Sequence, residues 1–110
     1  MSAVLDGLYA TLQGRKKADP ASSYVAGLYA RGNDAILKKI GEESAEVLLA
    51  AKGTDRAALV HELADLWFHS LILMAAKNIT PADVTAELAR RMNRSGLDEK
   101  AARNKQTRRN

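Results

Sequence analysis

The sequence predicts an all-α protein, an antiparallel bundle of about four to five helices. Alanine and leucine dominate the apolar positions, and the β-branched and aromatic residues form no alternating run typical of a strand. Glycine and proline fall between the apolar stretches, where helices have to end. A chain of 110 residues has room for one hydrophobic core. We therefore expect a single domain over residues 1–103, followed by a basic, flexible tail over residues 104–110.

Two helices are expected in the first 30 residues, the second of them short. Residues 3–16 carry apolar side chains at helical spacing, among them Val4, Leu8 and Leu12. A loop over residues 18–23 follows, because this stretch holds Asp, Pro and two serines. A second helix is expected over residues 23–30.

The third and fourth helices are longer and lie close together in the sequence. We expect the third to begin at an N-cap formed by Asn33 or Asp34 and to end at Lys52, with Gly53 as its C′ glycine. The fourth begins at a cap formed by Thr54 or Asp55 and runs to about residue 77. Because the connection is short, the two helices should form an antiparallel pair.

The fifth helix has the clearest start signal in the chain. Thr80 is placed to act as N-cap, Pro81 occupies the first helical position, and Asp83 favours the positive end of the helix dipole. We expect this helix to run to about residue 93. A last short helix is expected over residues 97–103, after a break at Ser95-Gly96.

Acidic residues interrupt the apolar stripe of the third helix. Glu43 lies one turn from both Ile40 and Val47, within that stripe, and Glu42 and Glu46 continue the acidic strip around the helix. On the fourth helix, Glu62 and Asp65 are three residues apart and border its apolar stripe in the same way. His69 lies on this side as well, whereas His61 is expected on the far side, without a role.

Buried carboxylates lose hydration and repel one another, so something must compensate their charge. Lys39 lies one turn before Glu43 and is expected to pair with it. A hard divalent cation such as Mg²⁺ would serve all the acids together. Taken singly, each acidic pair is more often a solvated helix face, and a lone histidine such as His69 is more often a satisfied core residue. Trp67 and Met74 are most simply core residues, and the apolar far side of the fourth helix suggests burial by a second subunit.

The positive charge is concentrated at the C-terminal end. Residues 90–110 hold eight basic and two acidic side chains, whereas residues 1–89 hold nine basic and eleven acidic ones. A basic end favours a polyanionic partner, either nucleic acid or a phosphorylated small molecule. The absence of cysteine excludes disulfides and thiol catalysis. We expect a cytoplasmic protein without a membrane span, because Asp65, His69 and Ser70 interrupt the most apolar stretch.

The acidic residues also carry a resemblance to a known family. The pattern E-E-x-x-E over residues 42–46, followed after 15 residues by E-x-x-D over residues 62–65, resembles that of the MazG-like all-α nucleotide pyrophosphohydrolases. Three flanking blocks, residues 18–32, 38–43 and 95–103, make the chain similar to one branch of them, the phosphoribosyl-ATP pyrophosphatase family of histidine biosynthesis. The resemblance covers about residues 8–103.

The resemblance implies a Mg²⁺-dependent hydrolysis of phosphoribosyl-ATP to phosphoribosyl-AMP and pyrophosphate in a homodimer or larger assembly. Carried over by position, the metal ligands are Glu43, Glu46, Glu62 and Asp65. Direct attack by water is the simplest mechanism, with Glu42 or Glu46 as general base.

Basic and polar residues near the acids are candidates for binding the substrate's phosphates. The first candidate is Lys39, which the ion pair with Glu43 accounts for equally well. The others are Tyr24, Arg31, Lys38, Arg94 and Lys100. Arg94 and Lys100 flank Ser95-Gly96, and in a dimer we expect them to complete the site of the neighbouring subunit.

Three other functions fit parts of the sequence. A house-cleaning pyrophosphohydrolase that acts on nucleoside triphosphates would use the same acids, but the flanking blocks argue against it. A helical nucleic-acid-binding protein would use the basic end, yet it has no need of inward-facing carboxylates and would want more aromatic residues. A structural bundle with a vestigial metal site predicts that removing a carboxylate is neutral or stabilising.

Overall fold

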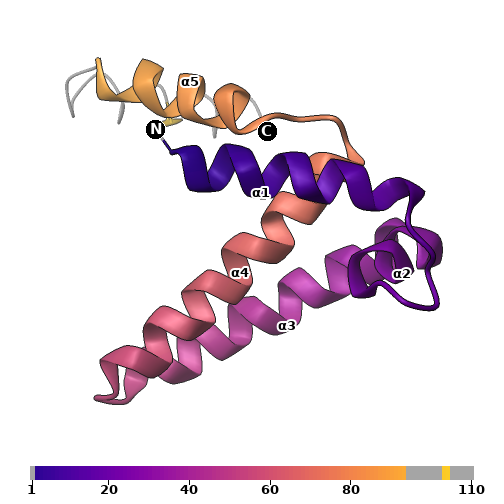
Figure 1. Ribbon diagram of the computed structural model, residues 1–110. Coiled ribbons are helices and arrows are strands. Elements are labelled where there is room, and N and C mark those ends of the chain that lie inside the picture. Colours follow the sequence, from indigo (N-terminus) through magenta and orange to yellow (C-terminus); the bar gives the residue numbers. More distant parts are fainter. Residues whose placement is uncertain (1, 94–102, 105–110) are drawn as a thin grey trace.

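The computed structural model describes residues 2–93 and 103–104, and within this part of the chain all regular structure is helical. The elements are α1 (Ala3–Gly14), a 3₁₀ turn (Arg15–Lys17), α2 (Tyr24–Arg31), α3 (Asn33–Lys52), α4 (Arg56–Ala76) and α5 (Pro81–Met92). This confirms the predicted fold class. Figure 1 shows α3 and α4 side by side as the expected antiparallel hairpin, with α1 crossing the far end of α4 and α5 running beside α1.

The hydrophobic core occupies one end of this hairpin. It forms where α1, α2, the beginning of α3 and the second half of α4 meet. Its buried members are Leu12, Val25, Leu28, Ile36, Leu71, Ile72 and Ala75. The other end of the hairpin projects away from this core, so that Leu48 and Leu49 of α3 are 68% and 66% exposed.

The turns before and after α3 differ from the prediction. The N-cap is Gly32, and Asn33 and Asp34 already belong to the first turn, so the predicted cap is wrong by at least one residue. Gly32 has φ 98°, which glycine adopts readily and other residues rarely do. Gly53 has φ −89° and so is not a left-handed C′ glycine as predicted. Asp55 caps α4 by accepting a hydrogen bond from the backbone N–H of Ala58 at 3.1 Å, which confirms one of the two candidates.

Smaller differences concern the ends of α1, α2 and α4. α1 ends at Gly14, two residues before its predicted end, because the chain tightens into the 3₁₀ turn. α2 is shifted by one residue, and the side chain of Ser23 serves as its N-cap. α4 ends at Ala76, where Asn78 turns the chain with φ 58°.

The start of α5 confirms the predicted N-cap Thr80 and the predicted place of Pro81, and it adds a capping box that was not predicted. Thr80 Oγ1 accepts from the backbone N–H of Asp83 at 3.1 Å, and Asp83 Oδ2 accepts from the N–H of Thr80 at 2.9 Å. These reciprocal bonds form a capping box, with Pro81 in the first turn. The helix ends at Met92. The predicted break at Ser95-Gly96 lies outside the described residues, as do most of the last helix (97–103) and of the tail.

The apolar character of α4 extends along its whole length. It is 21 residues long and contains an 18-residue window with a mean hydropathy of 1.3, and in the described part of the chain it alone has the length and composition of a membrane span. The core helix of a soluble protein has the same properties. In this structure α4 lies along α3. Glu62 and Asp65 of α4 are half-buried.

Candidate active site

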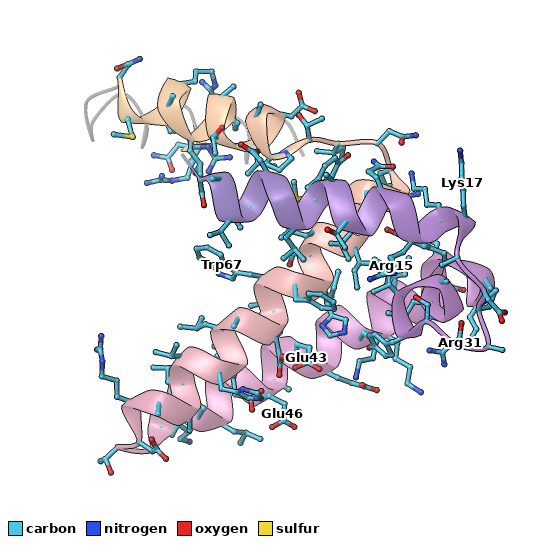
Figure 2. The ribbon with its side chains drawn as sticks, viewed as in Figure 1. Arg15, Lys17, Arg31, Glu43, Glu46 and Trp67 are labelled. Carbon is cyan, nitrogen blue, oxygen red and sulfur yellow. The ribbon has the colours of Figure 1, made fainter. Side chains whose placement is uncertain are left out.

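The acidic residues of α3 differ in burial as the helical spacing predicts. Glu43 is 9% exposed, whereas Glu42 and Glu46 are exposed. Figure 2 places Glu43 and Glu46 on successive turns of α3, beside α4. The acidic strip therefore begins inside the hairpin and runs outward to solvent.

Lys39 neutralises the inner end of this strip. Its Nζ lies 3.4 Å from Oε1 of Glu43, as predicted, and 3.3 Å from Oε2 of Glu42. Burial has the largest single effect on the pKa of Lys39 and lowers it. The hydrogen bonds to Glu42 and Glu43 and the charges of Tyr24 and Glu42 outweigh burial, so the pKa is raised above its usual value. Lys39 is therefore a firmly charged ammonium at neutral pH.

On α4, Glu62 and Asp65 lie close to His61, for which no role was predicted. One ligand atom each from His61, Glu62 and Asp65 lie within 4.8 Å of one another. His61 Nε2 is 3.3 Å from Asp65 Oδ2, so the prediction that His61 lies on the far side is wrong. The spacing of four residues could have revealed this, because residues i and i+4 are neighbours on a helix.

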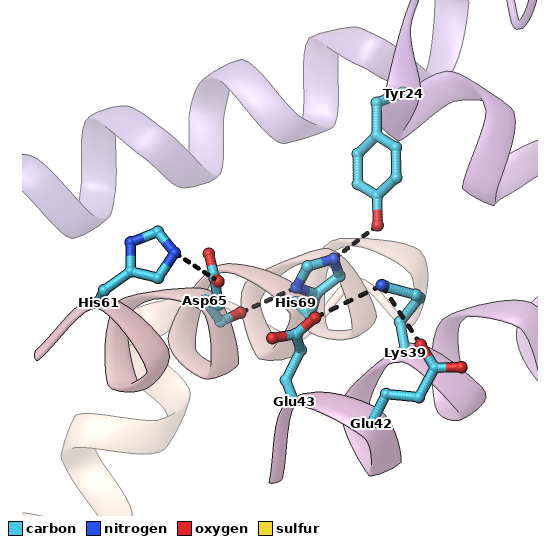
Figure 3. Close-up of polar contacts among 7 residues, drawn as sticks. All are labelled: Tyr24, Lys39, Glu42, Glu43, His61, Asp65 and His69. Atoms are coloured by element: carbon cyan, nitrogen blue, oxygen red, sulfur yellow. Dashed lines mark hydrogen bonds and ion pairs between the residues drawn. The ribbon is translucent and has the colours of Figure 1, made fainter. Parts of the chain in front are cut away.

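The four predicted metal ligands are distributed over both helices of the hairpin. The cluster on α4 contains Glu62 and Asp65 but neither Glu43 nor Glu46. The carboxylate of Glu43 points from α3 toward α4, on the side where Asp65 and His69 lie (Figure 3). Carboxylate oxygens from two adjacent helices are the donors that a hard divalent cation prefers, so the residues present fit such an ion.

His69 is a buried residue with both ring nitrogens hydrogen-bonded. It is 6% exposed, its Nε2 lies 2.7 Å from the hydroxyl of Tyr24, and its Nδ1 lies 2.8 Å from the backbone carbonyl of Asp65. The interpretation as a satisfied core histidine is therefore confirmed. No sequence signal pointed to the partnership, since Tyr24 and His69 are 45 residues apart.

A hollow lies beside α2. It has a volume of about 610 Å³ and is lined by residues 20–24 together with Gly27, Ala30 and Arg31. Of the predicted substrate-binding residues, Tyr24 and Arg31 thus border one open space, while Lys39 joins the acidic strip and Lys38 is exposed beside it. Arg94 and Lys100 lie outside the described residues.

A helical hairpin that carries E-E-x-x-E on one helix and E-x-x-D on the other has the architecture of the all-α nucleotide pyrophosphohydrolases. Comparison with known proteins narrows this class. The family model described as phosphoribosyl-ATP pyrophosphohydrolase matches residues 5–92. The chain belongs to this family of hydrolases, which confirms the resemblance seen in the sequence.

Curated relatives agree with the family model. Phosphoribosyl-ATP pyrophosphatase of Chromobacterium violaceum is 53% identical over 100 residues, covering 91% of this chain and 93% of the relative. The enzyme of the same name from Janthinobacterium sp. (strain Marseille) is 53% identical, and the match covers 94% of this chain and 97% of the relative. The enzyme of Nitrosospira multiformis is 56% identical, and the match covers 91% of this chain and 83% of the relative.

Proposed function

We propose that this chain hydrolyses 1-(5-phosphoribosyl)-ATP to 1-(5-phosphoribosyl)-AMP and pyrophosphate, the second step of L-histidine biosynthesis. The observation that carries the proposal is the pair of acidic motifs on α3 and α4, within a chain whose family match spans residues 5–92. The names and near-complete coverage of the curated relatives support the same substrate. We place the reaction in the cytoplasm, where a cysteine-free chain needs no oxidative folding.

Mg²⁺ is the proposed cofactor, held by Glu43, Glu46, Glu62 and Asp65. When bound, the ion supplies charge neutralisation for the leaving pyrophosphate and a template for the attacking water. The burial of Glu43 supports this role, because an acid that is 9% exposed needs a cation close by. Lys39 offers one positive charge to a strip of three carboxylates, which leaves negative charge for a divalent ion.

The chain's own residues would divide the remaining work. Either Glu42 or Glu46 accepts the proton of the water that attacks the α-phosphorus, and the bond between the α-phosphorus and the bridging oxygen breaks to release pyrophosphate. Both side chains are exposed on α3 and so are accessible to water. Oε2 of Glu42 forms an ion pair with Nζ of Lys39 at 3.3 Å.

Lys39 is the first choice for a phosphate contact, because it is charged and lies at the inner end of the acidic strip. Arg31 and the ring of Tyr24 border the hollow beside α2 and are proposed to contact the rest of the substrate. Lys38, Arg94 and Lys100 complete the proposed set of substrate-binding residues.

We further propose that the protein works as a homodimer. Trp67 is 58% exposed, so the prediction that it is a core residue is wrong. Val60 and Leu63, which lie at helical spacing from it along α4, are 54% and 38% exposed. Such a stripe is costly in water and is typical of a helix covered by a second subunit. The substrate is a small molecule, and neither nucleic acid nor a membrane is required.

The experiment is to measure pyrophosphate release from phosphoribosyl-ATP, ATP and dUTP, each with Mg²⁺ and with EDTA. Mg²⁺-dependent turnover of phosphoribosyl-ATP alone would establish the proposal. Turnover of the plain triphosphates instead would move the chain to the house-cleaning pyrophosphohydrolases. No turnover of any substrate would overturn the proposal altogether.

A further inference from the structure

Tyr24 and His69 form a hydrogen-bonded link between α2 and α4. The hydroxyl of Tyr24, the first residue of α2, lies 2.7 Å from Nε2 of His69, and Nδ1 of His69 lies 2.8 Å from the carbonyl oxygen of Asp65. The imidazole is 6% exposed, whereas the tyrosine is 52% exposed. The hydroxyl of the half-exposed Tyr24 is thus held in place by the buried imidazole of His69 (Figure 3).

The partners of the ring determine the direction of both hydrogen bonds. A backbone carbonyl can only accept, so Nδ1 of His69 carries the hydrogen that bonds Asp65. In the tautomer with the hydrogen on Nδ1 alone, Nε2 is the acceptor and the hydroxyl of Tyr24 donates to it. Phe68 and Tyr24 both meet the ring edge to face, at centroid distances of 5.3 and 5.8 Å, which further fixes the orientation of the imidazole.

This link joins the hollow beside α2 to the acidic hairpin. Tyr24 lines the hollow together with Arg31, which ends the same helix. Asp65, one turn before His69, belongs to the acidic cluster on α4. The N-cap bond from the N–H of Ala26 to Oγ of Ser23, at 3.2 Å, fixes the first turn of α2 next to the link. The wall of the hollow is therefore attached to the hairpin at its first helical residue.

We propose that Tyr24 and His69 are positioning residues that hold α2, and with it Arg31 and the hollow, in register with the carboxylates of the α3–α4 hairpin. This inference rests on the proposed function, because it assigns the hollow to the part of the substrate remote from the scissile phosphates. The link leaves every carboxylate oxygen untouched. Its loss should therefore weaken substrate binding and leave the binding of Mg²⁺ unchanged.

Tyr24→Phe is the first test, and Tyr29→Phe is its matched control. Tyr29 lies on the same helix, and its hydroxyl donates to the carbonyl of Leu12 at 2.9 Å. Each variant removes one hydroxyl and one hydrogen bond, so both should lower Tm by a similar amount. Tyr24→Phe alone should raise KM for phosphoribosyl-ATP, by about tenfold. Calorimetric titration with Mg²⁺ should give the same Kd for both variants and the wild type.

Variants of His69 separate positioning from direct contact with substrate. His69→Leu removes both bonds and should raise KM as Tyr24→Phe does, whereas His69→Gln keeps an acceptor and a donor and should restore part of the affinity. The double variant Tyr24→Phe/His69→Leu should bind substrate no worse than His69→Leu alone, because the two residues act as one unit. If His69→Leu proves unfolded by circular dichroism, the comparison of the two tyrosine variants still decides.

Equal KM values for Tyr24→Phe and Tyr29→Phe would overturn the inference. An additive double variant, or a changed Kd for Mg²⁺, would overturn it as well. These outcomes differ from failure of the proposed function, in which the wild type itself does not hydrolyse phosphoribosyl-ATP and both proposals fall together.

Discussion

The ammonium of Lys39 lies 3.4 Å from Oε1 of Glu43, the acid that the fold buries most deeply among those of the strip. Lys39 also contacts the exposed carboxylate of Glu42, at 3.3 Å. Lys39 therefore already pairs with a carboxylate that is also a proposed ligand of the metal ion. In the proposed function a divalent ion would compete with this ammonium for Glu43, and Lys39 would then be free to meet a phosphate of the substrate.

This competition predicts opposite effects of Lys39→Met on two affinities. When the ammonium of Lys39 is removed, the site that contains Glu43 should bind Mg²⁺ more tightly, by about threefold to tenfold, because no lysine then competes for the carboxylate. KM for phosphoribosyl-ATP should rise by about tenfold or more, because a charged phosphate contact is lost. Calorimetry without substrate measures the first effect, and steady-state kinetics at saturating Mg²⁺ the second. Lys52→Met, which removes an exposed lysine from the other end of α3, should change neither value. Weaker binding of Mg²⁺ by Lys39→Met would contradict the exchange.

The raised pKa of Lys39 predicts how its contribution to stability depends on pH. A lysine whose pKa is higher in the folded than in the unfolded state stabilises the fold at all pH values below the unfolded pKa of 10.5. This contribution disappears as the pH rises through the folded pKa. The difference in free energy of unfolding between wild type and Lys39→Met should thus be constant from about pH 7 to 9.5 and shrink above about pH 10.5. Because the pair is partly exposed, the difference should stay below about 1 kcal/mol.

Urea unfolding at a series of pH values measures that difference. The comparison with Lys39→Met cancels the titration of the other lysines, which both proteins share. A difference that already disappears between pH 7 and 9 would show that Lys39 is not the group concerned.

Glu43→Gln separates a working metal site from a vestigial one. The substitution keeps the shape of the side chain and removes its charge. Because Lys39 is partly exposed and keeps Glu42 as a partner, the free energy of unfolding in EDTA should change by no more than about 1 kcal/mol. Activity at saturating Mg²⁺ should fall by about 100-fold or more, because a ligand of the metal is lost. Glu87→Gln is the matched control, since Glu87 is also an acid paired with a cation four residues away, Arg91, but on α5. Unchanged activity of Glu43→Gln would favour the vestigial site.

Local sequence signals predicted the framework of the site well. The N-cap of α5 at Thr80 was predicted because it depends only on neighbouring residues. The burial of Glu43 followed from its place within the apolar stripe of a helix, because helical spacing determines which residues share a face. The pairing of α3 with α4 followed from their short connection.

Local sequence patterns do not specify contacts between residues that are far apart in the chain. The link between Tyr24 and His69 spans 45 positions and depends on how α2 packs on the hairpin, which no local pattern specifies. The cap predicted for α3 was misplaced by at least one residue, because Gly32, with φ 98°, takes the place expected of Asn33 or Asp34. His61 is different, since its distance of four residues from Asp65 was open to prediction.

The exposed stripe on α4 gives a prediction about the assembly that the protein's one tryptophan can report directly. Trp67 is 58% exposed in the single chain, so a second subunit covering α4 should shift its emission to the blue, and dilution should shift it back as the mass measured by sedimentation halves. Val60→Arg places a charge in the stripe two turns away and should give a monomer with red-shifted emission at all concentrations. Thr54→Arg adds the same charge at the exposed tip of the hairpin and should leave the dimer intact. A wild type that sediments as a monomer with the emission of an exposed indole would refute the dimer. A dimer whose emission does not respond to dilution would show that the subunits meet elsewhere, because Trp67 would then stay in water in both states.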